Sequence, residues 1–170
     1  MQKLSFKDKK GITLMELVVS LAIFSLAIMV VLTLLSTGVQ AQRKVLALQN
    51  VQENARFILE FMTKEIRMSN INAGNSSSLS ITRPDGERIQ YLFVNGNLER
   101  RTIPAGVGGP INSDSVSVNG SFYTIGIGTS DNLEPRATIV LSVQGKGTKT
   151  EEQAKIDLQT TLSQRTLDLP

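Results

Sequence analysis

The sequence predicts an α+β fold in which one long N-terminal helix, apolar in its first half and amphipathic in its second, packs against an antiparallel β-sheet. Three observations support this prediction. A long uncharged stretch lies near the N-terminus, apolar residues then recur at three- and four-residue spacing, and the last ninety or so residues form short alternating segments separated by turn residues.

The apolar half is defined by residues 17–35, which contain no charge and are interrupted only by Ser20, Ser25 and Thr33. Nineteen such residues are enough for a helix to cross a bilayer. The residues ahead of this stretch include four lysines and one aspartate, so the positive-inside rule places the N-terminus in the cytoplasm. We therefore expect a single membrane span with the rest of the chain outside.

The amphipathic half follows without a proline before Pro84. Its apolar stripe comprises Leu48, Val51, Ala55, Ile58, Met62 and Ile66, widened by Leu59 and Phe61. Its charged face carries Glu53, Arg56, Glu60, Lys64 and Arg67, with Glu60 and Lys64 in the favourable i, i+4 order. The predicted helix covers 12–69, about 87 Å at 1.5 Å per residue. A coiled coil is the weaker interpretation, because residues 70–74 end the stripe before three heptads are complete.

The remaining chain is predicted to be a β-rich headpiece. Residues 79–83 lead into the turn signal Pro84-Asp85-Gly86, and residues 88–94 alternate between apolar and polar side chains. Asn95-Gly96 then favours a type I′ hairpin turn before a strand over 97–102. Residues 104–110 have no periodicity and are predicted to be an irregular loop. Further strands are expected at 115–118, 121–127, 137–143 and 155–162.

Composition excludes several kinds of chemistry. The 170-residue chain has no histidine and no cysteine, so a Ser-His-Asp triad, a histidine metal site, a thiolate nucleophile and a disulfide are all excluded. The net charge of +3 reflects 18 basic and 15 acidic residues; residues 1–11 hold four lysines and one aspartate, so the chain without them has 14 of each. The basic excess therefore gives no support for nucleic-acid binding.

The other candidate ligand sites have simpler interpretations. Oxygen ligands for calcium occur in 131–134 and 112–114, but neither segment has EF-hand spacing, and Asx-type turns explain them. Arg100-Arg101 suits a solvated strand end better than a phosphate site, because stacking aromatics are sparse. The glycines at 106–109 and 126–128 lack the complete phosphate-binding patterns. We expect no cofactor, no metal and no enzymatic activity, since no motif brings carboxylates, hydroxyls or lysines together.

The segment Lys9-Lys10-Gly11-Ile12-Thr13-Leu14-Met15-Glu16-Leu17 resembles the processing site of type IV prepilins and type II secretion pseudopilins. The resemblance implies that Gly11 precedes the bond cut by prepilin peptidase, that Ile12 becomes the N-methylated residue, and that Glu16 pairs with the terminal amine of a neighbouring subunit during assembly. The family most often has phenylalanine at the position of Ile12, which is also bulky and apolar. Taken alone, Glu16 could instead be an interfacial acid at the positive end of the helix dipole.

Looser resemblances favour the larger minor pseudopilins or minor pilins of the J or W type. Residues 57–67 look like the end of their long helix, residues 88–100 like their hairpin, and residues 159–165 like their closing strand. The implied organisation is a leader over 1–11, a transmembrane and assembly half over 12–37, an amphipathic half over 38–72 and a periplasmic or extracellular headpiece over 73–170.

The resemblance predicts a structural subunit of a type IV pilus or type II secretion pseudopilus, located in the inner membrane and then in the filament. Its implied partners are prepilin peptidase, other pilin or pseudopilin subunits, the inner-membrane assembly platform and, before assembly, membrane lipid. An alternative remains open. Val39-Gln40-Ala41 has the small-residue spacing of a signal-peptidase site, which would make the chain an exported or membrane-anchored binding domain outside any filament.

Overall fold

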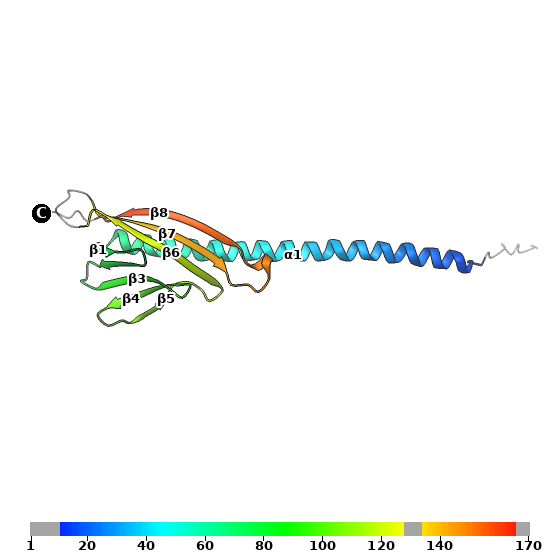
Figure 1. Cartoon of the computed structure of the whole chain (residues 1–170), viewed down its shortest axis with the longest axis horizontal. Helices are drawn as coiled ribbons and strands as arrows, with labels where there is room; N and C mark the ends of the chain where they lie inside the picture. Colours follow the sequence, from blue (N-terminus) through cyan, green and yellow to red (C-terminus); the bar gives the residue numbers. More distant parts are fainter. Residues whose placement is uncertain (1–10, 128–133, 166–170) are drawn as a thin grey trace, which may run out of the picture. The chain divides into compact units, whose positions relative to one another are not determined.

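The structure, a computed structural model, describes residues 11–127 and 134–165. They form an α+β fold with one long helix, α1, followed by two antiparallel sheets (Figure 1). The coarse prediction of an α+β fold with a long N-terminal helix is therefore confirmed. The chain divides into two compact units, residues 1–41 and 42–170.

In the first unit, the helix is apolar and fully exposed. Helix α1 spans Leu14–Arg67, and every described residue before Gln42 is exposed to solvent. Hydroxyl groups within this stretch bond to carbonyls four residues earlier, as Ser20 does to the carbonyl of Glu16 at 2.7 Å. Such bonds satisfy the hydroxyl donors of Ser20, Ser25, Thr33 and Thr37, so these four residues fit an apolar medium. The stretch is long and apolar enough to cross a membrane.

In the second unit, α1 buries the predicted stripe. Its buried residues are Val51, Ala55, Ile58, Met62 and Ile66. The prediction was wrong for Leu48 and Phe61, which are 40% and 37% exposed. Leu48 precedes the buried stripe, which begins at Val51. The predicted pair of Glu60 with Lys64 is also replaced, since Glu60 bonds to Arg56 at 2.7 Å.

The helix ends two residues earlier than predicted. After Arg67 the Ser69 side chain donates to the carbonyl of Glu65 at 2.7 Å, which satisfies a carbonyl of the last helical turn. The backbone N–H of Ile71 then donates to the side chain of Gln164 at 3.0 Å, so the chain leaves the helical path and enters a strand.

The first sheet contains five strands in the order β1-β2-β3-β4-β5. Their bounds are β1 Asn70–Gly74, β2 Ser78–Thr82, β3 Arg88–Val94, β4 Asn97–Ile103 and β5 Gly108–Pro110. The hairpin prediction is confirmed, because Asn95 and Gly96 both have positive φ, 50° and 73°, as a type I′ turn requires. β1 was not predicted, and the expected irregular loop over 104–110 ends in β5.

The second sheet contains three strands in the order β6-β7-β8. Their bounds are β6 Val116–Ile125, β7 Arg136–Gly145 and β8 Lys155–Ser163, with the short 3-10 helix η1, Thr150–Glu152, before β8. The two strands predicted at 115–118 and 121–127 are one continuous strand. Gly120 allows this, since a Cβ there would lie 2.2 Å from the carbonyl oxygen of Val140 and 2.6 Å from the ring of Phe93.

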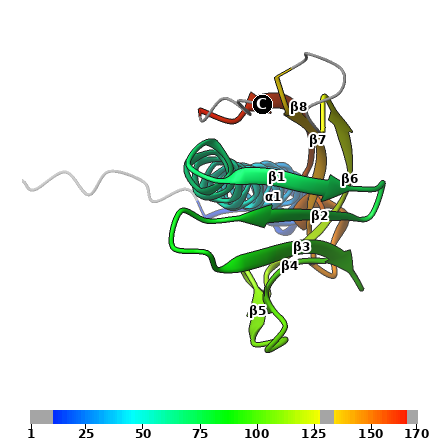
Figure 2. The same cartoon turned by 90° about the vertical axis from the view of Figure 1, so that its left-hand side faces the viewer.

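One hydrophobic core joins α1 to both sheets, which lie on two sides of the helix end (Figure 2). Phe93 of β3 and Phe122 of β6 stack with ring centroids 4.7 Å apart. Backbone bonds also cross between the sheets, from Val118 N–H to the Gly96 carbonyl at 2.8 Å. The headpiece was predicted to pack an antiparallel β-sheet against the helix, and the structure has two such sheets that share this junction.

Candidate functional site

The predicted processing residues lie just outside the start of α1. Gly11 and Ile12 have no regular secondary structure, and Ile12 is 74% exposed. A Cβ added to Gly11 would meet no atom within 4 Å. Within residues 11–127 and 134–165, both residues of the Gly11–Ile12 bond are therefore exposed. The rest of the predicted leader, residues 1–10, lies outside the described residues.

Thr13 fixes the point where the helix begins. The backbone N–H of Glu16 donates to the hydroxyl oxygen of Thr13 at 3.2 Å, and the N–H of Leu17 donates to the Thr13 carbonyl at 3.1 Å. This is the N-cap geometry, worth about 1 kcal/mol, and a glutamate three residues after a threonine completes the sequence pattern of a capping box. The helix therefore starts at Leu14 rather than at the predicted Ile12.

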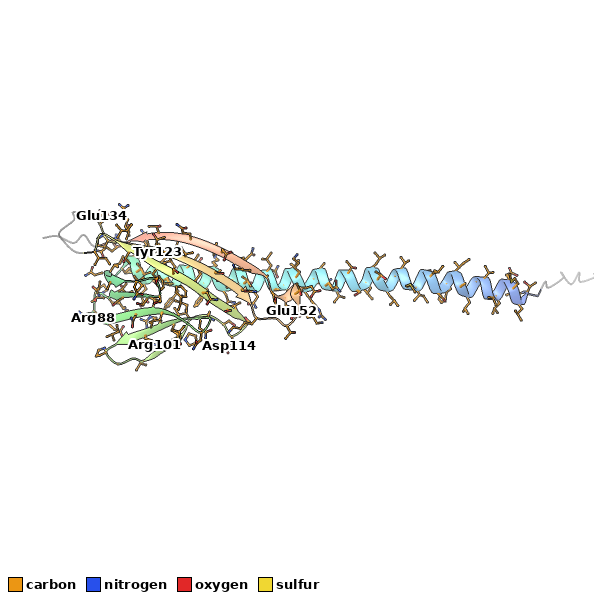
Figure 3. All side chains as sticks on the ribbon, in the orientation of Figure 1. Arg88, Arg101, Asp114, Tyr123, Glu134 and Glu152 are labelled. Carbon is orange, nitrogen blue, oxygen red and sulfur yellow. The ribbon has the colours of Figure 1, made fainter. Side chains whose placement is uncertain are left out.

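The carboxylate of Glu16 is available for a partner from outside the chain. No hydrogen bond or ion pair of this side chain occurs among residues 11–127 and 134–165, and the residue is exposed. Glu16 is also the only charged residue between Ile12 and Gln42. The apolar side chains of this stretch extend from the helix on all sides (Figure 3). The arrangement is thus one carboxylate, one turn from Ile12, on an otherwise apolar surface.

A second cluster of charges lies in the headpiece around Glu65, whose side chain is 14% exposed. Arg100 donates to both of its carboxylate oxygens, from Nη2 at 2.8 Å and from Nε at 3.1 Å. The hydroxyl of Tyr91 donates to the same carboxylate, and Arg83 Nε lies 3.9 Å from it. The cluster connects the last turns of α1 to β3, to β4 and to the turn that follows β2.

These contacts set the protonation of the cluster. Burial alone would raise the pKa of Glu65, but hydrogen bonds from Arg100 and Tyr91 and the charges of Arg100 and Arg83 outweigh burial and lower it. Burial and the bond to Glu65 raise the pKa of Tyr91. The bond to Glu65 raises the pKa of Arg100. Because Arg100 and Tyr91 bind the Glu65 carboxylate, the cluster acts as a structural clamp between α1 and the first sheet.

The other sequence candidates have structural roles or no partner. The side-chain oxygen of Asn112 accepts from the N–H of Leu98 at 2.9 Å, and its amide nitrogen bonds to the carbonyl of Val116 at 3.2 Å. Arg101 forms an ion pair with Glu99, two residues earlier in the chain. Residues 131–133 lie outside the described residues, while Glu134 is exposed (Figure 3). The described residues contain no group of three or more acidic side chains that could hold a metal.

The Glu65 clamp has no direct signal in the sequence. The indirect signals are that Glu65 precedes the buried Ile66 and that Tyr91 shares a face with Ile89 in an alternating strand. The sequence suggests only a phosphate ligand or a solvated strand end at Arg100, because the partner of this arginine is 35 residues away in the chain. Contacts of that range depend on how the sheet packs on the helix.

Comparisons with protein-family models, with curated proteins and with solved structures find no match to this chain. The assignment of function therefore depends on the geometry of the N-terminal segment and on the resemblance of its residues to a prepilin processing site.

Proposed function

We propose that the protein is a structural minor subunit of a type IV pilus or type II secretion pseudopilus, with a pilin-like fold. Prepilin peptidase cleaves after Gly11 and methylates Ile12, and the apolar helix then enters a filament. The observation that carries this proposal is the exposed apolar first half of α1, whose single carboxylate, Glu16, lies one turn from the cleavage position.

The exposed helix needs an apolar surrounding before and after assembly. Burying one large aliphatic side chain is worth about 1.5–3 kcal/mol, so a stretch with this many exposed apolar residues cannot remain in water. Lipid and a bundle of equivalent helices are similarly apolar, and transfer between them changes hydrophobic energy little. A specific polar contact is therefore needed to favour the bundle.

Glu16 supplies that contact in the proposed mechanism. Cleavage after Gly11 creates an α-amino group on Ile12, and methylation leaves that amine positively charged. A carboxylate in the apolar part of a membrane is costly unless it is paired. In the filament, Glu16 pairs with the amine of a neighbouring subunit, a partner that an isolated subunit in lipid lacks.

Location and orientation are part of the same proposal. Before cleavage the helix spans the inner membrane, with the lysines of residues 1–10 in the cytoplasm and the headpiece outside. Other pilin or pseudopilin subunits and the inner-membrane assembly platform are the proposed partners. Nucleic acid is not among them, because the chain after residue 11 has equal numbers of basic and acidic residues.

Mass spectrometry of the mature N-terminus, on protein from the native host, tests this function. A first residue of N-methylated Ile12 supports it. An N-terminus at Gln42 favours the alternative, an exported binding domain cut after Ala41, and one observation favours that outcome: the compact headpiece unit begins at Gln42. An uncut Met1 indicates a simple membrane anchor, and either of the last two results contradicts the proposal.

Replacing Glu16 with alanine is expected to leave membrane insertion intact and to lower incorporation into filaments about tenfold, which corresponds to about 1.4 kcal/mol. The reason is that the apolar helix is retained while the partner of the amine is lost. The measurement is the ratio of this subunit in sheared filaments to that in membranes. Asp114→Ala, which changes an exposed acidic residue of the headpiece, is the control. Normal incorporation of Glu16→Ala would show that the pairing mechanism is wrong.

A further inference from the structure

The second sheet has one covered edge and one open edge. At the β6 edge, Val118 N–H donates to the Gly96 carbonyl and Phe122 N–H to the Ser76 carbonyl, so the first sheet covers it. At the opposite edge, β8 pairs with β7 and with no other strand among the described residues. Within the described part of the chain, β8 therefore has one row of backbone groups that no other strand satisfies.

The register of β7 and β8 identifies those groups. Gly145 N–H donates to the Ala154 carbonyl at 2.9 Å, and Gln164 N–H donates to the Pro135 carbonyl at 3.3 Å. Bonded and non-bonded pairs alternate in an antiparallel ladder, so the even-numbered residues of β8 bond to β7. The odd-numbered residues direct their N–H and C=O groups to the open edge: Lys155, Asp157, Gln159, Thr161 and Ser163.

The open edge lacks most devices that prevent strand addition. Such edges are usually interrupted by a proline, a bulge or isolated charges. β8 contains no proline or glycine, and its register with β7 is unbroken from Ser163 to Lys155. Its two charges, Lys155 and Asp157, form an ion pair at 3.2 Å with each other.

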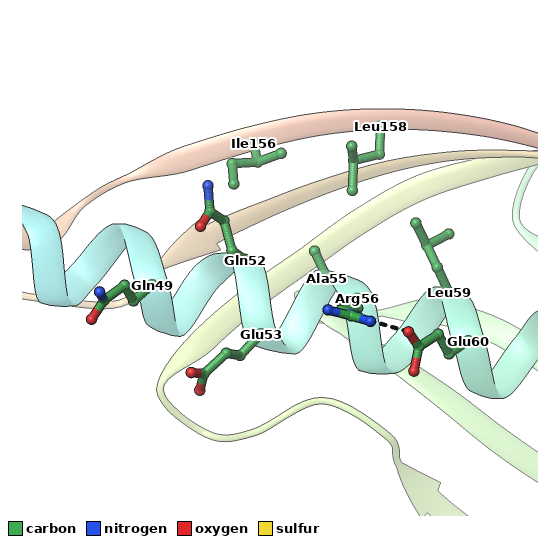
Figure 4. Close-up of a pocket in the computed structure, with 9 residues that line it drawn as sticks. All are labelled: Gln49, Gln52, Glu53, Ala55, Arg56, Leu59, Glu60, Ile156 and Leu158. Carbon is green, nitrogen blue, oxygen red and sulfur yellow. Dashed lines mark hydrogen bonds and ion pairs between the residues drawn. The ribbon is translucent and has the colours of Figure 1, made fainter.

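A groove of about 800 Å³ runs between this strand and α1 (Figure 4). Ile156 and Leu158 extend from β8 toward the helix, and Ala55 and Leu59 extend from the helix toward the strand. Ile156, Leu158 and Leu59 are only partly buried. Polar walls complete the groove: Gln49, Gln52, Glu53, Arg56 and Glu60. The open edge thus lies beside an apolar floor that the headpiece leaves partly uncovered.

We propose that the open edge of β8 and this groove bind an extended segment donated by a different protein, which joins the second sheet as a fourth strand. The backbone of the donor bonds to the odd-numbered residues of β8. Alternate side chains of the donor point inward and cover the apolar floor, so the donor carries small or medium apolar residues at every second position. Peptide hydrogen bonds supply affinity and the groove supplies selectivity.

A second copy of this chain does not fit as the donor. Residue numbers rise together along β8 and α1, since Ile156 and Leu158 lie by Ala55 and Leu59, and Arg165 N–H donates to the Arg67 carbonyl at 3.0 Å. β8 therefore runs in the direction of α1. Copies oriented alike in a membrane, as proposed above, have parallel β8 strands, whereas a two-fold β8 pair must be antiparallel. The other uncovered edge strands among the described residues, β1 and β5, have five and three residues and are too short to pair along the nine residues of β8. The donor is for these reasons a different protein.

The test places p-benzoylphenylalanine in place of Thr161, beside the open edge, in the full chain expressed in native-host cells. Irradiation then gives covalent adducts whose yield is measured in two backgrounds. Gln159→Pro removes one N–H that faces the open edge and removes no bond to β7. Edge strands tolerate proline at positions of this kind. Gln159→Ala loses the same side chain but keeps the N–H. We expect the proline variant to lower adduct yield about tenfold relative to the alanine variant.

Several results would overturn the proposal: equal yields in the two variants, no adduct in either, or an adduct that consists of a second copy of this chain. Adducts from p-benzoylphenylalanine in place of Tyr123, exposed on β6, should not respond to Gln159→Pro. If Gln159→Pro fails to fold, as judged by trypsin resistance, Asp157→Pro and Asp157→Ala provide the same comparison. The crosslinking result can be interpreted independently of N-terminal cleavage, because the mature N-terminus of the same sample is determined separately by mass spectrometry.

Discussion

Replacing Glu65 with glutamine is expected to lower the free energy of unfolding of the headpiece by about 2–3 kcal/mol at neutral pH. Glutamine keeps the shape of the side chain but removes the charge that Arg100 and Tyr91 bind. The side chains of Glu65 and Arg100 are 14% and 25% exposed, so solvent replaces little of the lost interaction. Urea unfolding of the full chain in detergent micelles measures this, with fluorescence of the two tyrosines, 91 and 123, as the signal.

The difference in unfolding free energy between the unsubstituted chain and the Glu65→Gln variant is also expected to depend on pH. The pKa of Glu65 is lower in the folded protein than its ordinary value of 4.5. The carboxylate therefore stabilises the fold fully above that value, and its contribution is lost as the pH falls through the lower, folded pKa. Unfolding measured at a series of pH values should show the two proteins converging in acid.

The control for this prediction is Glu60→Gln. Glu60 also bonds to an arginine, Arg56, but their side chains are 66% and 80% exposed, and exposed pairs of this kind are worth about 0.3–0.5 kcal/mol. A difference for Glu65→Gln that is no larger than the control, or that stays constant down to acid pH, would show that the clamp does not stabilise the headpiece.

The features that the sequence predicted well depend on local chemistry. The apolar stripe from Val51 to Ile66 follows from the 3.6-residue helical period, and the hairpin at Asn95-Gly96 follows from residues that accept positive φ. The strand over 155–162 follows from strict alternation and matches β8 within one residue. In each case the neighbours that determine the structure lie within a few positions in the chain.

The features that were missed depend on distant residues. Asn70–Gly74 forms β1 because β2 pairs with it and because Gln164 bonds to Ile71, 93 residues away. The separation into two sheets depends on contacts between β3 and β6 that no single segment encodes. The Glu65 clamp also depends on distant residues, because Tyr91 and Arg100 are 26 and 35 residues away from Glu65 in the chain. Sequence periodicity describes each element, but the pairing of elements depends on the assembled core.

The candidate processing site differs from both groups because it involves almost no tertiary structure. Gly11 and Ile12 precede α1 and Glu16 lies in its first turn, so linear spacing alone places them together. The fold adds the N-cap at Thr13, which sets the start of the helix. A site of this kind is recognised from sequence, and only processing experiments test it.

Replacing Phe122 with alanine is expected to have the largest effect on stability, a loss of about 3–5 kcal/mol. Phe122 is 1% exposed and stacks on Phe93, whose ring lies against Gly120. Removal leaves a cavity at the junction between the two sheets, where the ring of Phe122 packs on Phe93.

Urea unfolding followed by far-UV circular dichroism measures the loss, and Tyr123→Ala is the matched control. Tyr123 is the next residue of β6, but it faces the other side of the strand and is 57% exposed, so its removal should cost less than about 0.5 kcal/mol. Because the stacked rings join β3 to β6, Phe122→Ala should also separate the unfolding of the two sheets, which amide hydrogen exchange resolves strand by strand. Equal effects of the two substitutions would mean that the stacked pair does not hold the sheets together, and the backbone bonds from β6 to Gly96 and Ser76 would then account for their junction.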